Sequence, residues 1–349
     1  MGGGVGLKPI FAITMGDPAG IGPEVIVKAL SHREVYSMCV PVVVGDFEAM
    51  CDAISFCGFD LSLNVVCDIQ DARGEHGVID LIDLSFLKKG SWEYKSVSAL
   101  CGKASFEYVR RGIEMAMSGA VHGVITGPIC KEAINKAGFD YSGHTEIFAE
   151  FTGTKDYGML LLNGNLRIVH VTTHIPLSKV SEMITEERVF SAIKLANDAM
   201  IVLGFVNPRV AVAGLNPHAG ESGLFGYEEN NAIRPAVVRA VSDGIDAMGP
   251  LPPDTVFAKA LSGTYDVVVA MYHDQGHIPF KLSGFNFTGG DSAASSVSGV
   301  NCTIGLPIIR VSVDHGTAFD IAGEGRADEG SMIDAIKTGV MMAKHKFKS

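Results

Sequence analysis

The most constraining feature of the sequence is an unbroken apolar run at residues 267–271, which stops abruptly at a polar stretch containing His273 and Asp274. A continuous run of β-branched residues predicts a strand buried on both faces, as in a parallel sheet. In open α/β sheets, ligands bind at the carboxyl ends of the strands. We therefore expect His273 and Asp274 to take part in chemistry, although they could simply cap the strand and bond to the following turn.

The same pattern occurs twice more in the chain. The apolar run at residues 166–173 leads to His174, and the run at 209–215 leads to His218. Neutral imidazole is the commonest protein ligand for zinc and similar ions, and three such ligands with an open position describe a catalytic site. We therefore predict that His174, His218 and His273 converge on one divalent metal ion. Because their spacing matches no local zinc motif, three unrelated loop histidines remain the alternative.

Composition sets the broad class of the protein. The chain has 349 residues, of which 47% are hydrophobic and 19% charged, which predicts two domains or one large one with a sizeable core. The net charge is −11 and the basic residues form no block, which argues against a nucleic-acid partner. The sequence has no apolar run of about 18 residues and no signal-peptide pattern at its start. The seven cysteines form no CxxC pair, which is typical of reduced thiols, and we expect a cytoplasmic protein.

Strand-like and helix-like segments alternate along the chain. Apolar runs predict strands at residues 11–15, 40–44, 61–66, 121–126, 166–173, 209–215, 267–271 and 305–313. Helical spacing and caps predict helices at 23–30, 103–118, 131–137, 185–203, 229–242 and 331–344, one after an N-cap at Thr145 and one opening at 252–255. Residues 68–100 are polar and irregular, and the Gly/Ser-rich stretch 285–299 predicts a mobile surface loop. This order predicts an α/β protein with a mostly parallel sheet.

Seven short motifs resemble those of a known enzyme family. They are TMGDPAGIGPE, GHTE, THIPL, NPHAGE, PPDT, HDQG and VDHGTAFDIAG, which occur in the expected order from about residue 13 to residue 323. Together they resemble the 4-hydroxythreonine-4-phosphate dehydrogenase family of pyridoxal phosphate biosynthesis. That resemblance implies the isocitrate and isopropylmalate dehydrogenase type of fold, with two α/β/α domains and a cleft between them. The implied domains are a cofactor-side domain at residues 1–126 plus 303–349 and a metal, substrate and dimerisation domain at 127–302.

The resemblance also implies a reaction. A metal-dependent NAD(P) dehydrogenase of this family oxidises 4-phosphohydroxy-L-threonine to 2-amino-3-oxo-4-phosphohydroxybutanoate, which then loses CO2 to give 3-amino-2-oxopropyl phosphate. It acts as a homodimer whose site is completed by the partner subunit. A paralogous branch acts instead on D-threonate or D-erythronate 4-phosphate in sugar-acid catabolism. The phrase NPHAGESGLFGYEE resembles that branch, and His277 stands where the biosynthetic enzymes more often have an apolar residue.

Individual residues match the family's functional positions. His174, His218 and His273 match its metal ligands, which implies one divalent ion per subunit; zinc, cobalt, manganese and magnesium are candidates, and imidazole favours the later transition metals over magnesium. Lys281 and Arg310 are also cations beside predicted strand ends, which suits a phosphorylated acid, although either could form a surface salt bridge. The residues matched to substrate contacts are His144, Thr145, Lys281, Asn301 and Arg310.

The resemblance places the cofactor on the loop at residues 315–323, with contacts from His315, Gly316 and Asp320. An acidic residue there can bond a ribose 2′-hydroxyl and repels a 2′-phosphate, so we expect NAD rather than NADP. Asp320 could alternatively cap a helix.

The general base is open among three residues. Asp254, Asp274 and Lys281 each lie at a predicted turn near the site. The two aspartates could instead orient the histidines. A zinc hydrolase is an alternative of another class, because it would use the three histidines but would not need the 315–323 loop.

Overall fold

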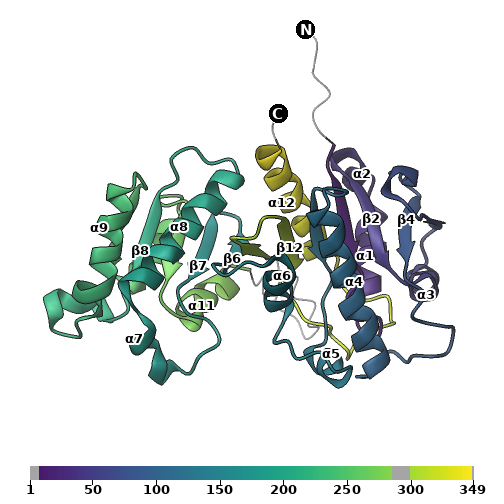
Figure 1. The fold of residues 1–349 in the computed structure, drawn as a ribbon, viewed down its shortest axis with the longest axis horizontal. Coiled ribbons are helices and arrows are strands. Elements are labelled where there is room, and N and C mark those ends of the chain that lie inside the picture. The colour runs from purple at the N-terminus through teal and green to yellow at the C-terminus, as the bar shows by residue number, and fades with distance from the viewer. Residues whose placement is uncertain (1–7, 285–298, 348–349) are drawn as a thin grey trace, which may run out of the picture. The chain divides into compact units, whose positions relative to one another are not determined.

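The structure is a computed structural model that describes residues 8–284 and 299–347 (Figure 1). The chain divides into two compact units: unit 1 comprises residues 1–154 and 306–349, and unit 2 comprises residues 155–305. Each unit contains a β-sheet and the helices that cover it, so the predicted α/β class is confirmed. The sequence placed the boundaries at 126/127 and 302/303. Residues 127–154 group with unit 1 because α5 (Lys131–Lys136) and α6 (His144–Thr152) both pack on α4 (Ala99–Met117).

The sheet of unit 1 is parallel throughout its described strands. Its strand order is β3-β4-β2-β1-β5-β12. The side chains of β1 are almost all buried, as a strand covered on both faces requires. The bounds are β1 (Ile10–Thr14), β2 (Val40–Gly45), β3 (Ser62–Val65), β4 (Val78–Asp83), β5 (Gly123–Thr126) and β12 (Ile309–Val313).

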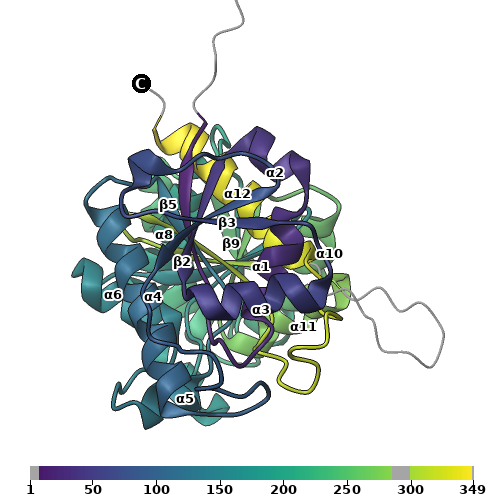
Figure 2. The ribbon, with the colours of Figure 1, turned by 90° about the vertical axis from the view of Figure 1, so that its right-hand side faces the viewer.

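Helices cover both faces of this sheet. The backbone of α4 approaches the sheet at Gly112, where an added Cβ would meet Thr14 and Val124. On the other face, Gly339 of α12 (Gly330–Lys346) approaches the alternate side chains Phe11 and Ile125. Around α12 lie α1 (Gly22–Leu30) and α2 (Arg33–Met38), while α3 (Phe47–Cys57) packs on α1 (Figure 2).

The sheet of unit 2 is mixed. Its strand order is β11-β6-β7-β10-β8-β9, in which β6 pairs antiparallel with β11 and β7, and the pairs from β7 to β9 are parallel. The antiparallel part departs from the mostly parallel sheet that the sequence predicted, because β6 and β7 form a hairpin that turns at Gly164. The bounds are β6 (Gly158–Asn163), β7 (Leu166–His170), β8 (Val210–Ala213), β9 (Ala247–Leu251), β10 (Val267–Ala270) and β11 (Val300–Ile304).

One side of the unit 2 sheet carries the two helices that matter for the site. Side chains of β7, β8 and β10 pack there against Phe257 of α10 (Pro253–Leu261) and Phe280 of α11 (His273–Gly284), forming one core cluster. The helix α8 (Glu186–Val202) also packs on these strands, with α9 (Arg234–Ser242) beside it. The shorter turns are η1 (Ile69–Asp71), η2 (Leu177–Lys179), α7 (Val180–Met183), η3 (Pro217–Gly223) and η4 (Glu229–Ile233).

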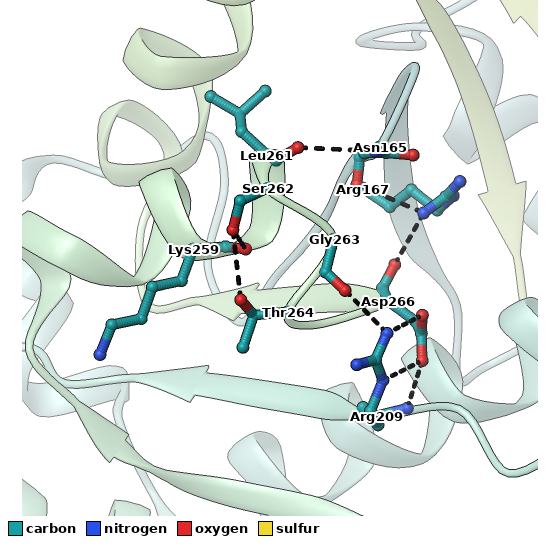
Figure 3. A network of polar contacts seen from close by, with 9 residues as sticks. All are labelled: Asn165, Arg167, Arg209, Lys259, Leu261, Ser262, Gly263, Thr264 and Asp266. Atoms are coloured by element: carbon teal, nitrogen blue, oxygen red, sulfur yellow. Dashed lines mark hydrogen bonds and ion pairs between the residues drawn. The ribbon is translucent and has the colours of Figure 1, made fainter.

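A polar network fixes the amino ends of the parallel strands (Figure 3). Arg209, just before β8, donates from Nε and Nη2 to the two carboxylate oxygens of Asp266, just before β10, at 3.0 and 2.9 Å. The Asp266 carbonyl accepts from Arg167 of β7 at 3.2 Å. Because ligands bind at the carboxyl ends of such strands, this network lies at the edge of the sheet opposite to the expected ligand site.

The expected helix caps are partly correct. Thr185 caps α8, since its side chain accepts from the Arg188 amide at 3.4 Å. Thr145 does not cap a helix: α6 begins at His144, and Gly143 is the cap residue. The stretch 68–100 was expected to be irregular but contains β4. The expected loop at 285–299 lies, except for residue 299, outside the described residues.

Two further sequence expectations concern the whole chain. No helix in the described ranges is long and apolar enough to cross a membrane. All seven cysteines are free thiols, with Cys67 exposed and Cys39, Cys101 and Cys302 buried. Burial raises the pKa of the Cys39 thiol to about 12, so this thiol stays protonated and unreactive.

Candidate active site

Three histidines leave neighbouring strands at the same edge of the unit 2 sheet. β10 pairs in parallel with β7 on one side and β8 on the other, so the three carboxyl ends are adjacent. His174 follows β7, His273 opens α11 after β10, and His218 lies in η3 after β8. This adjacency is what a metal site built from the three imidazoles requires of the topology.

Of the three rings, those of His174 and His273 lie close to each other. The ring centroids of His174 and His273 are 5.8 Å apart, close to the roughly 5–6 Å expected for two imidazoles on one ion. His218 has its Nδ1 atom 4.0 Å from a carboxylate oxygen of Asp254. Among the described residues, no three His, Cys, Asp or Glu side chains are spaced to hold a metal ion. The donor chemistry therefore fits a divalent ion, and the complete ligand set stays a prediction.

The backbone that carries His218 is strained. Residues 218–222 all have positive φ, including 53° at His218 and 41° at Glu221. Such left-handed conformations cost roughly 1–3 kcal/mol for each residue that is not glycine, and they are concentrated at functional sites. The buried Glu229 holds the start of this loop: its Oε1 accepts from the amides of Leu215 and Asn216 at 2.8 and 2.7 Å. Glu229 is thus a positioning residue that the sequence pattern did not indicate.

His273 belongs to a stack of imidazoles. Its ring lies parallel to that of His277 with centroids 3.6 Å apart, and His277 is 4.9 Å from His170. His170 is buried, and this burial lowers its pKa to about 3, so it is neutral at physiological pH. The spacing of four residues from His273 to His277 to Lys281 places these three side chains on one face of α11. That spacing was the available signal for His277, whereas nothing in the sequence pointed to His170.

The two candidate aspartates lie beside histidines. Asp274 Oδ1 accepts a hydrogen bond from His273 Nδ1 at 2.7 Å, which leaves Nε2 of that ring for a ligand. A carboxylate oxygen of Asp254 lies 4.0 Å from His218 Nδ1. Both aspartates line one hollow of about 600 Å³ between α10 and α11. Its other lining residues are Pro253, Phe257, Ala258, Leu261, Tyr272, Gln275, Ile278, Pro279, Leu282 and Ser283.

A second group of predicted residues gathers in unit 1. Arg310 of β12 is only 2% exposed; its Nη2 donates to Thr126 Oγ1 at 3.0 Å, and its guanidinium lies 5.6 Å from the ring centroid of Phe148. His144 is partly buried, and its desolvation, followed by the charges of Arg310 and Lys131, lowers its pKa well below the ordinary value. The structure therefore brings His144 and Arg310 together, with Thr145 next in α6.

Lys281 and Asn301 belong to unit 2. Lys281 lies on α11 with its ammonium 5.9 Å from the ring centroid of Phe280. Asn301 lies on β11, where it pairs with Leu161, and its side-chain amide contacts the Met159 sulfur at 2.8 Å. Their predicted contacts with substrate remain predictions.

The predicted cofactor loop, which contains His315, Gly316 and Asp320, is pinned to unit 1 at several points. The Thr317 carbonyl accepts from the Ile21 amide at 3.0 Å. Lys95 donates to the Asp320 carbonyl at 2.9 Å, which leaves the exposed Asp320 carboxylate available to a ligand. An added Cβ at Gly316 would meet nothing within 4 Å. Hydrogen bonds to its backbone therefore hold the loop, while Gly316 and the Asp320 carboxylate stay accessible to a ligand.

The fold and these two groups of residues define the class of the protein. The chain is an NAD(P)-dependent dehydrogenase with an α/β fold, as the sequence predicted. More particularly, the family model described as "Pyridoxal phosphate biosynthetic protein PdxA" matches residues 37–339, and the chain belongs to this family.

Individual relatives match over nearly the full length. D-threonate 4-phosphate dehydrogenase of Salmonella typhimurium is 45% identical over 334 residues, which cover 95% of this chain and 98% of that protein. The enzyme of the same name from Cupriavidus necator is 43% identical over 339 residues, covering 97% and 98%. A solved structure titled 4-hydroxythreonine-4-phosphate dehydrogenase, from Klebsiella pneumoniae, is 41% identical with a TM-score of 0.87, covering 97% and 99% of the two chains.

Proposed function

We propose that the enzyme oxidises D-threonate 4-phosphate, a four-carbon hydroxy acid with a terminal phosphate, using NAD. The observation that carries this proposal is the 43–45% identity, over at least 95% of the chain, to two enzymes named for that substrate. The buried guanidinium of Arg310 beside His144 supports a phosphorylated substrate, because arginine binds phosphate through several directed hydrogen bonds.

The imidazole stack supports a hydroxy acid over an amino acid. D-threonate 4-phosphate carries a hydroxyl where 4-phosphohydroxy-L-threonine carries an ammonium. A hydroxyl can donate to or accept from the rings of His170, His174, His273 and His277, whereas an ammonium can only donate. An ammonium is also repelled by a divalent ion held at the same place. His277, stacked 3.6 Å from His273, is the residue that we expect to favour the hydroxyl.

A second candidate is the reaction that the sequence implied first, oxidation of 4-phosphohydroxy-L-threonine followed by decarboxylation. The family description and the Klebsiella pneumoniae structure favour it. Asp254 and Asp274, both more than half exposed on one hollow, could accept hydrogen bonds from an ammonium.

Each residue has a role in the proposed reaction. His174, His218 and His273 would hold one divalent ion, with zinc, cobalt, manganese and magnesium as candidates. When bound, the ion would lower the pKa of the substrate hydroxyl and stabilise the developing carbonyl. Asp274 orients the ring of His273, and Asp254 would orient the ring of His218. Lys281, Asp254 and Asp274 are the candidates for the base that takes the hydroxyl proton.

The remaining roles concern the two ends of the substrate and the cofactor. Arg310, His144 and Thr145 hold the phosphate, and Lys281 and Asn301 contact the acid. His315 and Gly316 line the cofactor, and Asp320 bonds the ribose 2′-hydroxyl of NAD and disfavours NADP. Oxidation gives a β-keto acid, which can lose CO2. We include in the proposal a cytoplasmic homodimer whose site is completed by the partner subunit.

A comparison of substrates tests the proposal. Initial rates of NADH formation would be measured with D-threonate 4-phosphate, D-erythronate 4-phosphate and 4-phosphohydroxy-L-threonine, and with NADP in place of NAD. We expect the highest kcat/KM for D-threonate 4-phosphate with NAD, and a smaller preference over the amino acid in His277→Leu. A higher kcat/KM for 4-phosphohydroxy-L-threonine would establish the second candidate instead.

A further inference from the structure

Lys131 is a cation placed beside the predicted phosphate contacts in unit 1. Its Nζ atom lies 4.0 Å from the point where a Cβ on Gly143 would stand, next to His144. Within the described ranges its ammonium has no hydrogen bond or ion pair, although six side chains of α4 and α5 form ion pairs. Lys131 and Arg310 both act on the partly buried ring of His144 and disfavour its protonated form. Two cations thus flank one neutral imidazole.

The amino end of α6 lies at the same place. This nine-residue helix begins at His144, and its cap residue, Gly143, has no side chain to bond the first amides. Free amides at a helix amino end, together with the helix dipole, favour an anion. Independently, the Nε2 atom of His144 is buried without a hydrogen-bond partner in the part of the chain that the structure describes. Buried polar atoms normally have a hydrogen-bond partner. A bound anion that retains a proton, or a water molecule bound with the anion, would supply that partner.

We propose that Lys131 is a further substrate-binding residue, which together with Arg310 and the amino end of α6 holds the phosphoryl group rather than the carboxylate of the substrate. A phosphate monoester carries a charge of about −1.5 to −2 at neutral pH, which two cations balance. A carboxylate carries −1 and would leave one cation uncompensated. Thr126 Oγ1 accepts from Arg310 Nη2 at 3.0 Å, which holds the guanidinium in place beside His144. This assignment rests on the proposed function.

Kinetics with a matched control test the role of Lys131. We expect Lys131→Met to raise KM for D-threonate 4-phosphate by about tenfold to a hundredfold, as loss of one charge-assisted phosphate contact predicts, with a smaller change in kcat. Lys131→Arg should restore most of the loss. Lys136→Met is the control, because Lys136 lies on the same short helix but is paired with Glu132 at 2.9 Å. A KM for Lys131→Met within twofold of that control would overturn the assignment.

Binding of inorganic phosphate separates this inference from the proposed function. The dissociation constant would be measured by calorimetry on the full-length wild type, Lys131→Met and Lys136→Met, in a buffer without phosphate. About tenfold weaker binding in Lys131→Met alone supports the site even if none of the three substrates is oxidised. Equal binding by wild type and Lys131→Met, or no binding by wild type, overturns it. Unchanged circular dichroism melting in both variants would show that the fold is intact.

Discussion

At the scale of single residues, Asp17 is a buried acid whose charge is costly. Its Oδ1 accepts from the Ala19 amide at 2.9 Å, while Oδ2 has no partner in the described part of the chain. Burial raises its pKa from 3.8 to about 6. Because the folded state binds this proton more tightly than the unfolded state, the contribution of Asp17 to the free energy of unfolding is most favourable at low pH. It falls as pH rises from about 4 to 6, by about 3 kcal/mol for a two-unit shift.

Replacing Asp17 by Asn should therefore stabilise the protein in a pH-dependent way. Asn keeps the acceptor for Ala19 and removes the buried charge, so the free energy of unfolding at pH 8 should rise by about 1–3 kcal/mol. Below about pH 3 the difference between variant and wild type should nearly vanish, because the carboxyl is then mostly protonated in both states. Urea unfolding at pH 3 and pH 8 measures both values. A loss of stability at pH 8, or the same difference at both pH values, would refute the argument.

Sequence reasoning found the residues whose type and position carry their own signal. His174, His218 and His273 stood out because each follows an apolar run. Glu229, His170 and Lys131 did not, because their roles arise from tertiary contacts: Glu229 bonds a loop some 13–14 residues earlier in the chain, and His170 is distinguished by its burial. No local pattern encodes such contacts.

At the scale of elements, α11 is the helix that presents His273, His277 and Lys281. It packs closely on β7, since an added Cβ at Gly276 would stand 2.3 Å from His170 Nε2 and 2.8 Å from Ile168. Sequence reasoning took this segment for a strand end followed by a turn. Gly276 and Pro279 lower its intrinsic helix propensity, and the burial of Phe280 in the core cluster stabilises the helix in spite of them.

We predict that Gly276→Ala destabilises the protein although alanine favours helices by about 1 kcal/mol. The close approach to β7 should cost roughly 1–3 kcal/mol, and a displaced α11 should lower kcat by shifting His273. Chemical unfolding and initial rates would measure the two effects. In the background of His170→Ala the same substitution should cost clearly less. Equal costs in both backgrounds would show that the contact with His170 does not limit the packing.

Some elements were missed for identifiable physical reasons. β4 contains the buried Asp80, which interrupts its apolar pattern; the carboxylate is satisfied by the amides of Arg73 and Gly74 at 3.1 and 2.8 Å and by Asn64. β9 contains Pro250, which disfavours a strand in sequence reasoning but is tolerated at an edge. The strands that were predicted are mostly those buried on both faces, where the apolar run is continuous.

At the scale of the whole molecule, the α/β class and the family followed from the sequence, whereas the extents of the units did not. Alternating strands and helices and seven ordered motifs identify the class. No sequence pattern in the segment 127–154 indicates the unit to which it belongs, because its place depends on the packing of α5 and α6 against α4. The predicted residues are divided between the units: the three histidines, Lys281 and Asn301 lie in unit 2, and His144, Thr145 and Arg310 lie in unit 1.

The central claim is that this dehydrogenase oxidises a phosphorylated hydroxy acid with a divalent ion on His174, His218 and His273. The most direct test is the rate of NADH formation from D-threonate 4-phosphate after treatment with EDTA and removal of the chelator, then after adding back zinc, cobalt, manganese or magnesium. We predict that the rate falls at least a hundredfold, that one of these ions restores it, and that none restores it in His273→Ala. A full rate in the EDTA-treated protein would contradict the account.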